Sequence, residues 1–132
     1  MIGLDTNILV RYLTQDDQIQ ADISCRLINR YINCERAIFL NNIVICELIW
    51  VLERGYKYRK DQIITVLNEI LSTVEFNFEN QELLWLSLKV FESSTADFSD
   101  ILIGKLNQLQ GCDYTYSFDS NTSSLEEFEL PS

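Results

Sequence analysis

Residues 37–53, Ala-Ile-Phe-Leu-Asn-Asn-Ile-Val-Ile-Cys-Glu-Leu-Ile-Trp-Val-Leu-Glu, place a short apolar run before a longer one, with two asparagines between them. The run from Ala37 to Leu40 has the length and composition of a buried strand. Asn41 or Asn42 can cap a following helix, because an asparagine side chain accepts a hydrogen bond from the free N–H groups of the first turn. The run from Ile43 to Glu53 is apolar nearly all round, which is typical of a buried helix. This stretch therefore predicts a strand that leads directly into a helix.

The same order recurs along the rest of the chain. Further strands are predicted at Ile2 to Leu4, Val74 to Phe78 and Tyr114 to Phe118, and further helices at 18–32, 61–71, 82–91 and 101–109. Short strands that alternate with helices indicate an α/β fold, with a parallel sheet covered by helices on both faces. The length of 132 residues suits a single domain. In such a fold, ligands bind where the carboxyl ends of the strands run into helices.

The composition excludes several kinds of chemistry. The chain has 20 Asp plus Glu, 10 Lys plus Arg, a net charge of −10 and no histidine. Without histidine there is no Ser-His-Asp or Cys-His relay and no histidine-containing zinc site. The acidic surplus also disfavours a general nucleic-acid-coating role, because that affinity comes largely from Lys and Arg neutralising phosphates. Any reaction must use carboxylates, hydroxyls, thiols, lysines or a bound ion.

The four cysteines lie far apart and form no Cys-x-x-Cys pair. We expect them to be buried free thiols in a reducing compartment. The first residues do not have the pattern of a signal peptide, and no apolar run approaches the roughly 20 residues of a membrane span. The sequence therefore predicts a cytoplasmic protein that does not enter a membrane.

Five acids stand at strand ends or within apolar segments instead of on a polar helix face. Asp5 and Asp119 each follow a predicted strand. Glu47 interrupts the apolar helix, where burying a lone carboxylate costs several kcal/mol or raises its pKa. Asp97 and Asp100 are three residues apart at the start of a helix and therefore share a face.

Each of these acids has a simpler explanation. Asp5 could cap the next helix, Asp97 with Thr95 could form an ordinary N-cap, Glu47 could be partly exposed, and Asp119 could be a turn residue. Taken separately, these explanations do not account for the coincidence that all five acids could project into one crevice. Oxygen ligands without histidine or cysteine nearby select Mg²⁺ or Mn²⁺ over zinc.

Five segments that cover nearly the whole chain have the order and spacing of one family. They are Ile2 to Val10 (Ile-Gly-Leu-Asp-Thr-Asn-Ile-Leu-Val), Cys46 to Glu53, Ala96 to Gly104, Gly111 to Asp113 and Tyr116 to Asp119. In these segments the chain resembles PIN-domain nucleases, and in particular the VapC-type toxins of bacterial toxin–antitoxin pairs. The resemblance implies a single PIN domain over residues 1–132. Its fold would be a three-layer α/β/α sandwich with a central, mainly parallel sheet of four to five strands.

The resemblance also implies a metal-dependent endoribonuclease that uses Mg²⁺ or Mn²⁺. Asp5, Glu47, Asp100 and Asp119 match the four acidic catalytic positions of the family. By analogy, Asp5 and Asp100 would hold the first ion, and Asp119 and Asp97 would complete its shell or serve a second ion. Glu47 would position or deprotonate the attacking water. Cleavage would leave a 5′-phosphate and a 3′-hydroxyl.

The polar residues Thr6, Asn7 and Ser117 match family positions near the metal. Ser117 stands where the family usually has threonine, a change that keeps the hydroxyl. Ser-Asn follows Asp119, where family members often carry lysine or arginine, so a phosphate contact of the family is missing at that edge.

A basic segment is the candidate for RNA contact. Residues 54–60 hold four of the ten basic residues, with two tyrosines between them: Arg54, Lys57, Arg59 and Lys60, with Tyr56 and Tyr58. Such a loop suits contacts with phosphates and stacking on bases. The alternative is that these cations are drawn to a helix C-terminus by its dipole.

The resemblance implies three partners: an RNA substrate, a cognate antitoxin protein and a second copy of the chain in a homodimer. Two other functions are considered. The first is a catalytically silent PIN-fold module that binds a partner protein or RNA, and its sign would be the loss of one or more acids. The second is a glycosidase with a carboxylate pair, which would act without metal.

Overall fold

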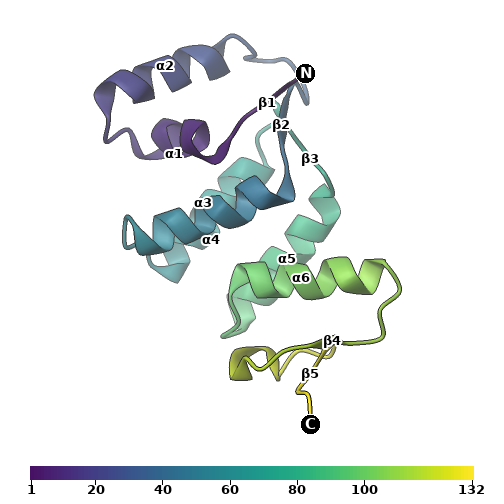
Figure 1. Cartoon of the computed structure of the whole chain (residues 1–132). Coiled ribbons are helices and arrows are strands. Elements are labelled where there is room, and N and C mark those ends of the chain that lie inside the picture. Colours follow the sequence, from purple (N-terminus) through teal and green to yellow (C-terminus); the bar gives the residue numbers. More distant parts are fainter. The chain divides into compact units, whose positions relative to one another are not determined.

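The computed structural model describes residues 1–132, which form two compact units, 1–81 and 82–132 (Figure 1). The first unit contains β1 (Ile2–Gly3), α1 (Thr6–Thr14), α2 (Gln18–Asn29), β2 (Ile38–Leu40), α3 (Asn42–Arg54), α4 (Lys60–Leu71) and β3 (Phe76–Phe78). The second contains α5 (Gln81–Ser93, with its first residue still in the first unit), α6 (Phe98–Leu109), β4 (Thr115–Tyr116), the 3₁₀ helix η1 (Ser120–Thr122) and β5 (Phe128–Glu129).

The first unit is built on a three-stranded parallel sheet in the order β1-β2-β3. Ile2 lies opposite Ile38, which in turn lies opposite Phe76. Two helices connect each strand to the next, so the unit repeats the strand-to-helix order read from the sequence (Figure 1). Side chains alternate along β2 and β3, and those on one face are buried: Ile38, Leu40, Phe76 and Phe78. The predicted α/β class is confirmed.

The second unit packs α6 beside a small parallel sheet of β4 and β5. Thr115 lies opposite Phe128, and Asn107 of α6 donates a hydrogen bond of 3.0 Å to the Thr115 hydroxyl. The Phe91 and Phe98 rings of α5 and α6 meet edge-on, with their centroids 5.8 Å apart. The strand that ends near Asp119 is therefore fixed to α6 through β5 and Asn107.

The strand count requires a correction. Four to five strands were expected in one central sheet, whereas the structure has three in the larger sheet and two in a separate one. β5 lies in the acidic tail, where no strand was predicted. Strands of two or three residues carry too little periodicity to show which strand they pair with, so the sequence pattern locates strands better than it assigns them to a sheet.

Helix α1 was not predicted. Its N-cap is Asp5, which accepts a hydrogen bond of 3.2 Å from the Ile8 amide. β-Branched residues such as Ile8 and Val10 weaken helix propensity, so the local signal is poor. Burial of Leu9 and Val10 stabilises the helix instead. Elsewhere the predicted cap is confirmed, since the Asn41 side chain accepts from the Val44 amide at the start of α3.

The expectation of buried cysteines is wrong in part. Cys34 and Cys112 are exposed, while Cys25 and Cys46 are half-buried, and all four are free thiols. Cys34 follows the end of α2 and Cys112 the end of α6, and turns of this kind lie at the surface. No helix combines the length and apolar composition that crossing a membrane would require.

Gly104 allows the close approach of α6 to the strand β5. A Cβ atom added at this position would overlap the Phe128 ring, with 2.9 Å to its Cζ, and would lie 3.1 Å from the Glu127 Cγ. Phe128 and Glu127 are both buried and have little room to move. The neighbouring Lys105 ammonium lies 3.3 Å from the Glu127 carboxylate, so an ion pair reinforces the same contact.

We expect Gly104→Ala to lower the free energy of unfolding by about 1–3 kcal/mol, the usual cost of overpacking a filled core. Gly3→Ala is the matched control, because the nearest atom to a Cβ there is the Phe39 carbonyl oxygen at 4.0 Å. Urea titration of both variants measures the effect. Equal stability of the two variants would show that α6 and β5 are not closely packed.

Candidate functional site

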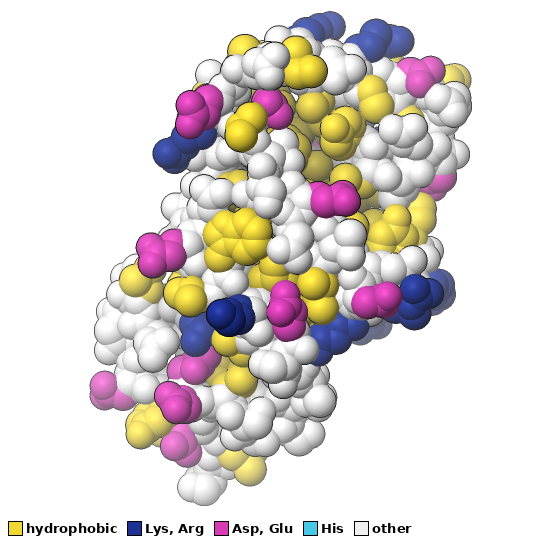
Figure 2. All heavy atoms as spheres, turned by 180° about the vertical axis from the view of Figure 1, so that it is seen from behind, with side chains coloured by type: hydrophobic (Ala, Val, Ile, Leu, Met, Phe, Trp, Pro, Cys, Tyr) yellow, Lys and Arg dark blue, Asp and Glu magenta, His cyan; other side chains and the backbone are white.

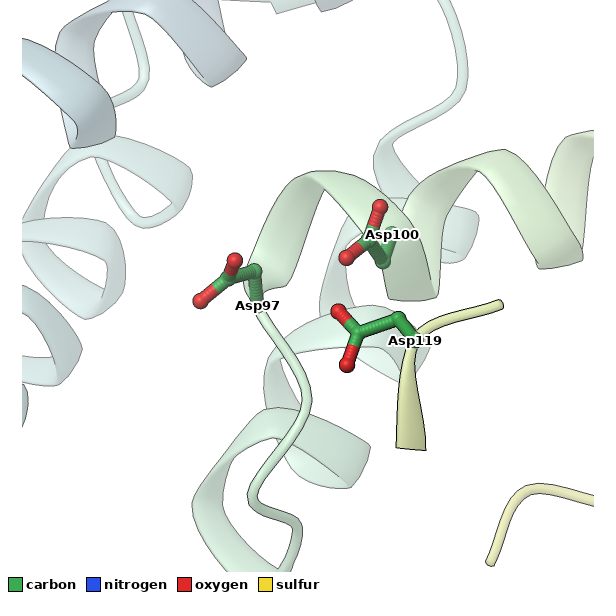
Figure 3. A group of neighbouring side chains, drawn as sticks. All are labelled: Asp97, Asp100 and Asp119. Carbon is green, nitrogen blue, oxygen red and sulfur yellow. The ribbon is translucent and has the colours of Figure 1, made fainter. Parts of the chain in front are cut away.

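Three aspartates converge in the second unit. Asp97 and Asp100 lie at the start of α6, and Asp119 follows β4 (Figure 3). One carboxylate oxygen from each residue lies within 4.8 Å of the other two. Asp97 is exposed, whereas Asp100 and Asp119 are half-buried. Asp119, which is 19 or more residues from the other two in sequence, is thus brought beside the start of the helix that carries them. The proximity of these three acids was expected from the sequence.

Asp97 occupies the N-cap position of α6 but its side chain makes no capping hydrogen bond. The explanation of Asp97 as an N-cap therefore holds for its backbone only, and its carboxylate takes no part in capping. Asp100 lies in the first turn, where the unpaired N–H groups of the helix attract negative charge. The helix end thus partly offsets the repulsion between the two acids.

Asp119 is held by two local hydrogen bonds. Its amide donates to the Ser117 hydroxyl at 3.0 Å, and its Oδ1 accepts from the Asn121 amide at 2.9 Å. The turn explanation is therefore correct for the backbone of Asp119. Its carboxylate is nevertheless directed toward Asp97 and Asp100 (Figure 3). Ser117, one of the predicted supporting residues, therefore lies beside the cluster, and its hydroxyl helps to fix the backbone of Asp119.

The cluster raises the pKa of the Asp100 carboxyl above its ordinary value. Partial burial is the largest cause, followed by the negative charges of Asp97 and Asp119 and a hydrogen bond shared with Asp119. None of the three acids has a Lys or Arg partner among the ion pairs of the structure. The arrangement therefore favours any cation that can enter it.

The donor set fits a small divalent ion. Mg²⁺ binds oxygen at about 2.0–2.1 Å, so ligands on opposite sides of the ion are about 4.2 Å apart. Carboxylate oxygens within 4.8 Å of one another reach that spacing with small side-chain rotations. A cluster of carboxylates alone suits Mg²⁺ or Mn²⁺ and is a poor zinc site.

A second group of predicted residues lies in the first unit. The Thr6 hydroxyl at the start of α1 donates a 3.1 Å hydrogen bond to Glu47 Oε1 on α3. Asp5 precedes Thr6 and caps α1, as its simpler explanation held, and Asn7 is exposed beside it. Glu47 is exposed, so the expectation of a carboxylate buried in an apolar helix is wrong.

The reason is that α3 is buried on one face only. Leu48 and Leu52 are fully buried, whereas Ile43 is 69% exposed and Trp50 is 61% exposed. Residues 43, 47, 50 and 54 recur at helical spacing, which places Glu47 on the exposed face despite its apolar neighbours in sequence. Amino-acid type alone could not distinguish this face from the buried one.

A cleft of about 320 Å³ opens beside Asp5 in the first unit. It lies between α1 and α2, and its polar lining consists of Asp5, Asn7, Arg11, Gln20 and Ser24. The predicted acids therefore form two groups, one in each unit.

The basic loop between α3 and α4 is anchored by Asp16, which is not one of the five acids singled out in the sequence. The Tyr56 hydroxyl donates to Asp16 Oδ2 at 2.7 Å, and Arg11 donates to Asp16 Oδ1 at 3.0 Å. The hydrogen bond from Tyr56 is the main reason that the pKa of Asp16 is lowered. No local spacing could identify this contact, because 40 residues separate its partners.

The four cations of this loop differ in their surroundings. All four are exposed, and Lys57 has a left-handed backbone with φ of 58°. Arg59 pairs with Asp61 at 3.1 Å, and Lys60 begins α4. On the face drawn in Figure 2, the Lys and Arg side chains form small groups with acids between them, without a continuous basic band.

Comparison with known proteins shows which family this chain matches. The family model described as "PIN domain" matches residues 2–127. A VapC ribonuclease of Aquifex aeolicus (strain VF5) is 27% identical over 99 residues, which is 75% of this chain and 73% of that protein. The match extends over residues of both units, including every acid of the two groups.

We expect Asp100→Asn to stabilise the metal-free protein at pH 7, by an amount that solvent screening keeps small. The raised pKa means that ionised Asp100 opposes folding. This cost is absent below the unfolded pKa of about 3.9, where the group is protonated in both states. It grows as the pH rises above that value and is complete above the folded pKa.

Thermal unfolding in EDTA at about pH 7 and about pH 3 tests this prediction. The exposed acid Asp113, outside the cluster, supplies the control variant Asp113→Asn. Asp100→Asn should be more stable than the parent protein only at the higher pH. A gain of the same size at both pH values would contradict an electrostatic origin.

Proposed function

We propose that this chain, which belongs to the PIN domain family, is a metal-dependent endoribonuclease and the toxin of a toxin–antitoxin pair. The observation that carries the proposal is the group of three carboxylates at the start of α6, which has no cationic partner. The match to a VapC ribonuclease supports RNA as the substrate. All the acids of the family pattern are present, so nothing favours a catalytically silent module.

The proposed site uses Asp5, Glu47, Asp100 and Asp119 as its catalytic acids. Asp5 and Asp100 would bind one Mg²⁺ or Mn²⁺ ion, and Asp119 and Asp97 would complete its coordination or hold a second ion. The geometry of the cluster in the second unit supports this assignment for three of these residues. Asp5 is assigned to the same site by analogy with the family.

The bound ion would polarise the phosphoryl oxygen and favour ionisation of a water molecule. Glu47 is suited to orient that water and to accept its proton, because it is an exposed carboxylate. The Thr6 hydroxyl donates to Glu47 Oε1, which holds the carboxylate in one orientation. In-line attack by water on phosphorus, without the 2′-hydroxyl, would leave a 5′-phosphate and a 3′-hydroxyl.

The basic loop would contribute RNA contacts through Arg54 and Lys57, which are exposed. Arg59 and Lys60 belong to the same proposed contact, although Arg59 is engaged with Asp61. Tyr56 serves mainly as an anchor, because its hydroxyl is bound to Asp16. Four exposed cations, of which Arg59 is already paired with Asp61, suit local binding of a few phosphates instead of tight binding along a whole strand.

We also propose that residues 1–132 form a single PIN domain that acts in the cytoplasm, as a homodimer and under the control of an antitoxin. Exposed apolar side chains support a need for protein partners. Ile19 is 74% exposed, and Ile43 and Trp50 are exposed on α3. Contact with a partner would remove this apolar surface from water.

The central prediction is RNA cleavage that depends on Mg²⁺ or Mn²⁺ and stops in EDTA. We expect Asp100→Asn to reduce the rate at least about 100-fold, since the ion contributes several kcal/mol of transition-state stabilisation. Asp113→Asn is the control. Sequencing of product ends should find 5′-phosphates and 3′-hydroxyls. Cleavage that survives EDTA, or 2′,3′-cyclic phosphate ends, would falsify the mechanism.

Charge reversal in the loop should weaken RNA binding without affecting the metal site. We expect Arg54→Glu combined with Lys57→Glu to raise KM about tenfold and to flatten its dependence on salt. Lys89→Glu, an exposed lysine of α5, is the control. Titration of Mn²⁺ should give the same affinity in all three proteins. An unchanged KM would remove the loop from the proposed RNA-binding surface.

A further inference from the structure

A cavity of about 270 Å³ lies next to the acid cluster, entirely within the second unit. Its apolar lining comes from Phe118, Phe128 and Leu130, and its hydroxyl groups include those of Ser120 and Ser123. Asp119, one of the three clustered acids, also lines it. The cavity and the candidate metal site thus share a wall.

Phe118 is the most unusual residue of this lining. It is 86% exposed, although an aromatic ring contributes to stability mainly when it is buried. It stands between Ser117, whose hydroxyl holds the Asp119 amide, and Asp119 itself. The fold therefore leaves an aromatic ring uncovered one residue from the candidate metal site.

The size of the cavity limits the ligand. Complete small-molecule sites commonly measure about 300–1,000 Å³, so 270 Å³ suits one planar ring system better than a whole nucleotide. Phe118 supplies the exposed aromatic surface, because Phe128 is buried against α6. The serine hydroxyls can accept from the edge of a ring, and the Ser123 hydroxyl already donates to the Ser120 carbonyl at 2.6 Å. No lysine or arginine lines the cavity, and Asp119 and Glu129 would repel a phosphate.

We propose that this cavity binds a nucleobase of the RNA, next to the phosphate that is cleaved, and that Phe118 stacks on this base. The inference rests on the proposed function, because the occupant is part of the RNA substrate. A neutral base fits a wall that contains acids, whereas the phosphate is directed to the metal. Since Asp119 belongs to both the cavity and the cluster, a base bound here sets which phosphate reaches the metal.

The first test measures binding independently of cleavage. Glu47→Gln protein with Mg²⁺ is titrated with short single-stranded RNAs, each carrying one 2-aminopurine at a different position. Stacking on Phe118 should change the fluorescence at one position only. Adding Phe118→Ala should abolish that change and weaken binding about tenfold, the range of one base–aromatic contact. Phe118→Trp should retain both.

The control is Tyr114→Ala, which removes a 52% exposed aromatic residue that does not line the cavity. It should leave the fluorescence change and the affinity intact. Because Phe118 is itself exposed, its replacement should not affect folding, and thermal unfolding of each variant checks this. Loss of the signal in both alanine variants would overturn the assignment to Phe118.

The second test uses the active protein. Phe118→Ala should raise KM about tenfold with little change in kcat and should spread cleavage over additional phosphates in sequenced products. Active Phe118→Ala protein with unchanged KM and cleavage positions would overturn the nucleobase cavity while the ribonuclease proposal stands. Absence of both RNA cleavage and RNA binding in the parent protein would overturn the ribonuclease proposal, and the cavity assignment with it.

Discussion

Repulsion among the three carboxylates at the start of α6 is the constraint that the packing of the second unit has to overcome. Asp97, Asp100 and Asp119 offer oxygens within 4.8 Å of one another and have no Lys or Arg between them. The helix N-terminus and the Asn121 amide offset part of this repulsion, and partial exposure lets water screen more of it. Partial burial, followed by the repulsion that remains, raises the pKa of Asp100 and makes the site attractive to a divalent cation.

The position of Asp119 depends on packing well away from the carboxylates. Gly104 lets β5 approach α6, and the Lys105–Glu127 ion pair strengthens that contact. β5 in turn pairs with β4, which leads into Ser117 and Asp119. Since Asp97 and Asp100 are carried by α6 itself, the absence of a Cβ at residue 104 determines how closely the third acid approaches them. Gly104 has no functional group in its side chain, yet it contributes to the geometry of the site.

Local sequence pattern predicted much of this structure because its main elements are locally encoded. Asn41 caps α3 as a short polar residue before an apolar run should, and Asp97 and Asp100 share the helix start that their spacing indicates. Features fixed by distant contacts were missed. Helix α1 depends on burial of its side chains, and Asp16 acquires its role from Tyr56 on another loop. The exposed face of α3, which carries Glu47, is likewise determined by packing and not by residue type.

The net charge of −10 has a different meaning once the acids are located. Asp97, Asp100 and Asp119 belong to one cluster, so a divalent ion bound there would cancel two of their three charges. On the face drawn in Figure 2, acids are interspersed with small groups of Lys and Arg. An acidic chain can therefore act on a polyanion, provided that binding relies on the ion, a few exposed cations and contacts with uncharged bases. Affinity of this kind is concentrated at the cleavage site, whereas a basic surface would distribute it along the strand.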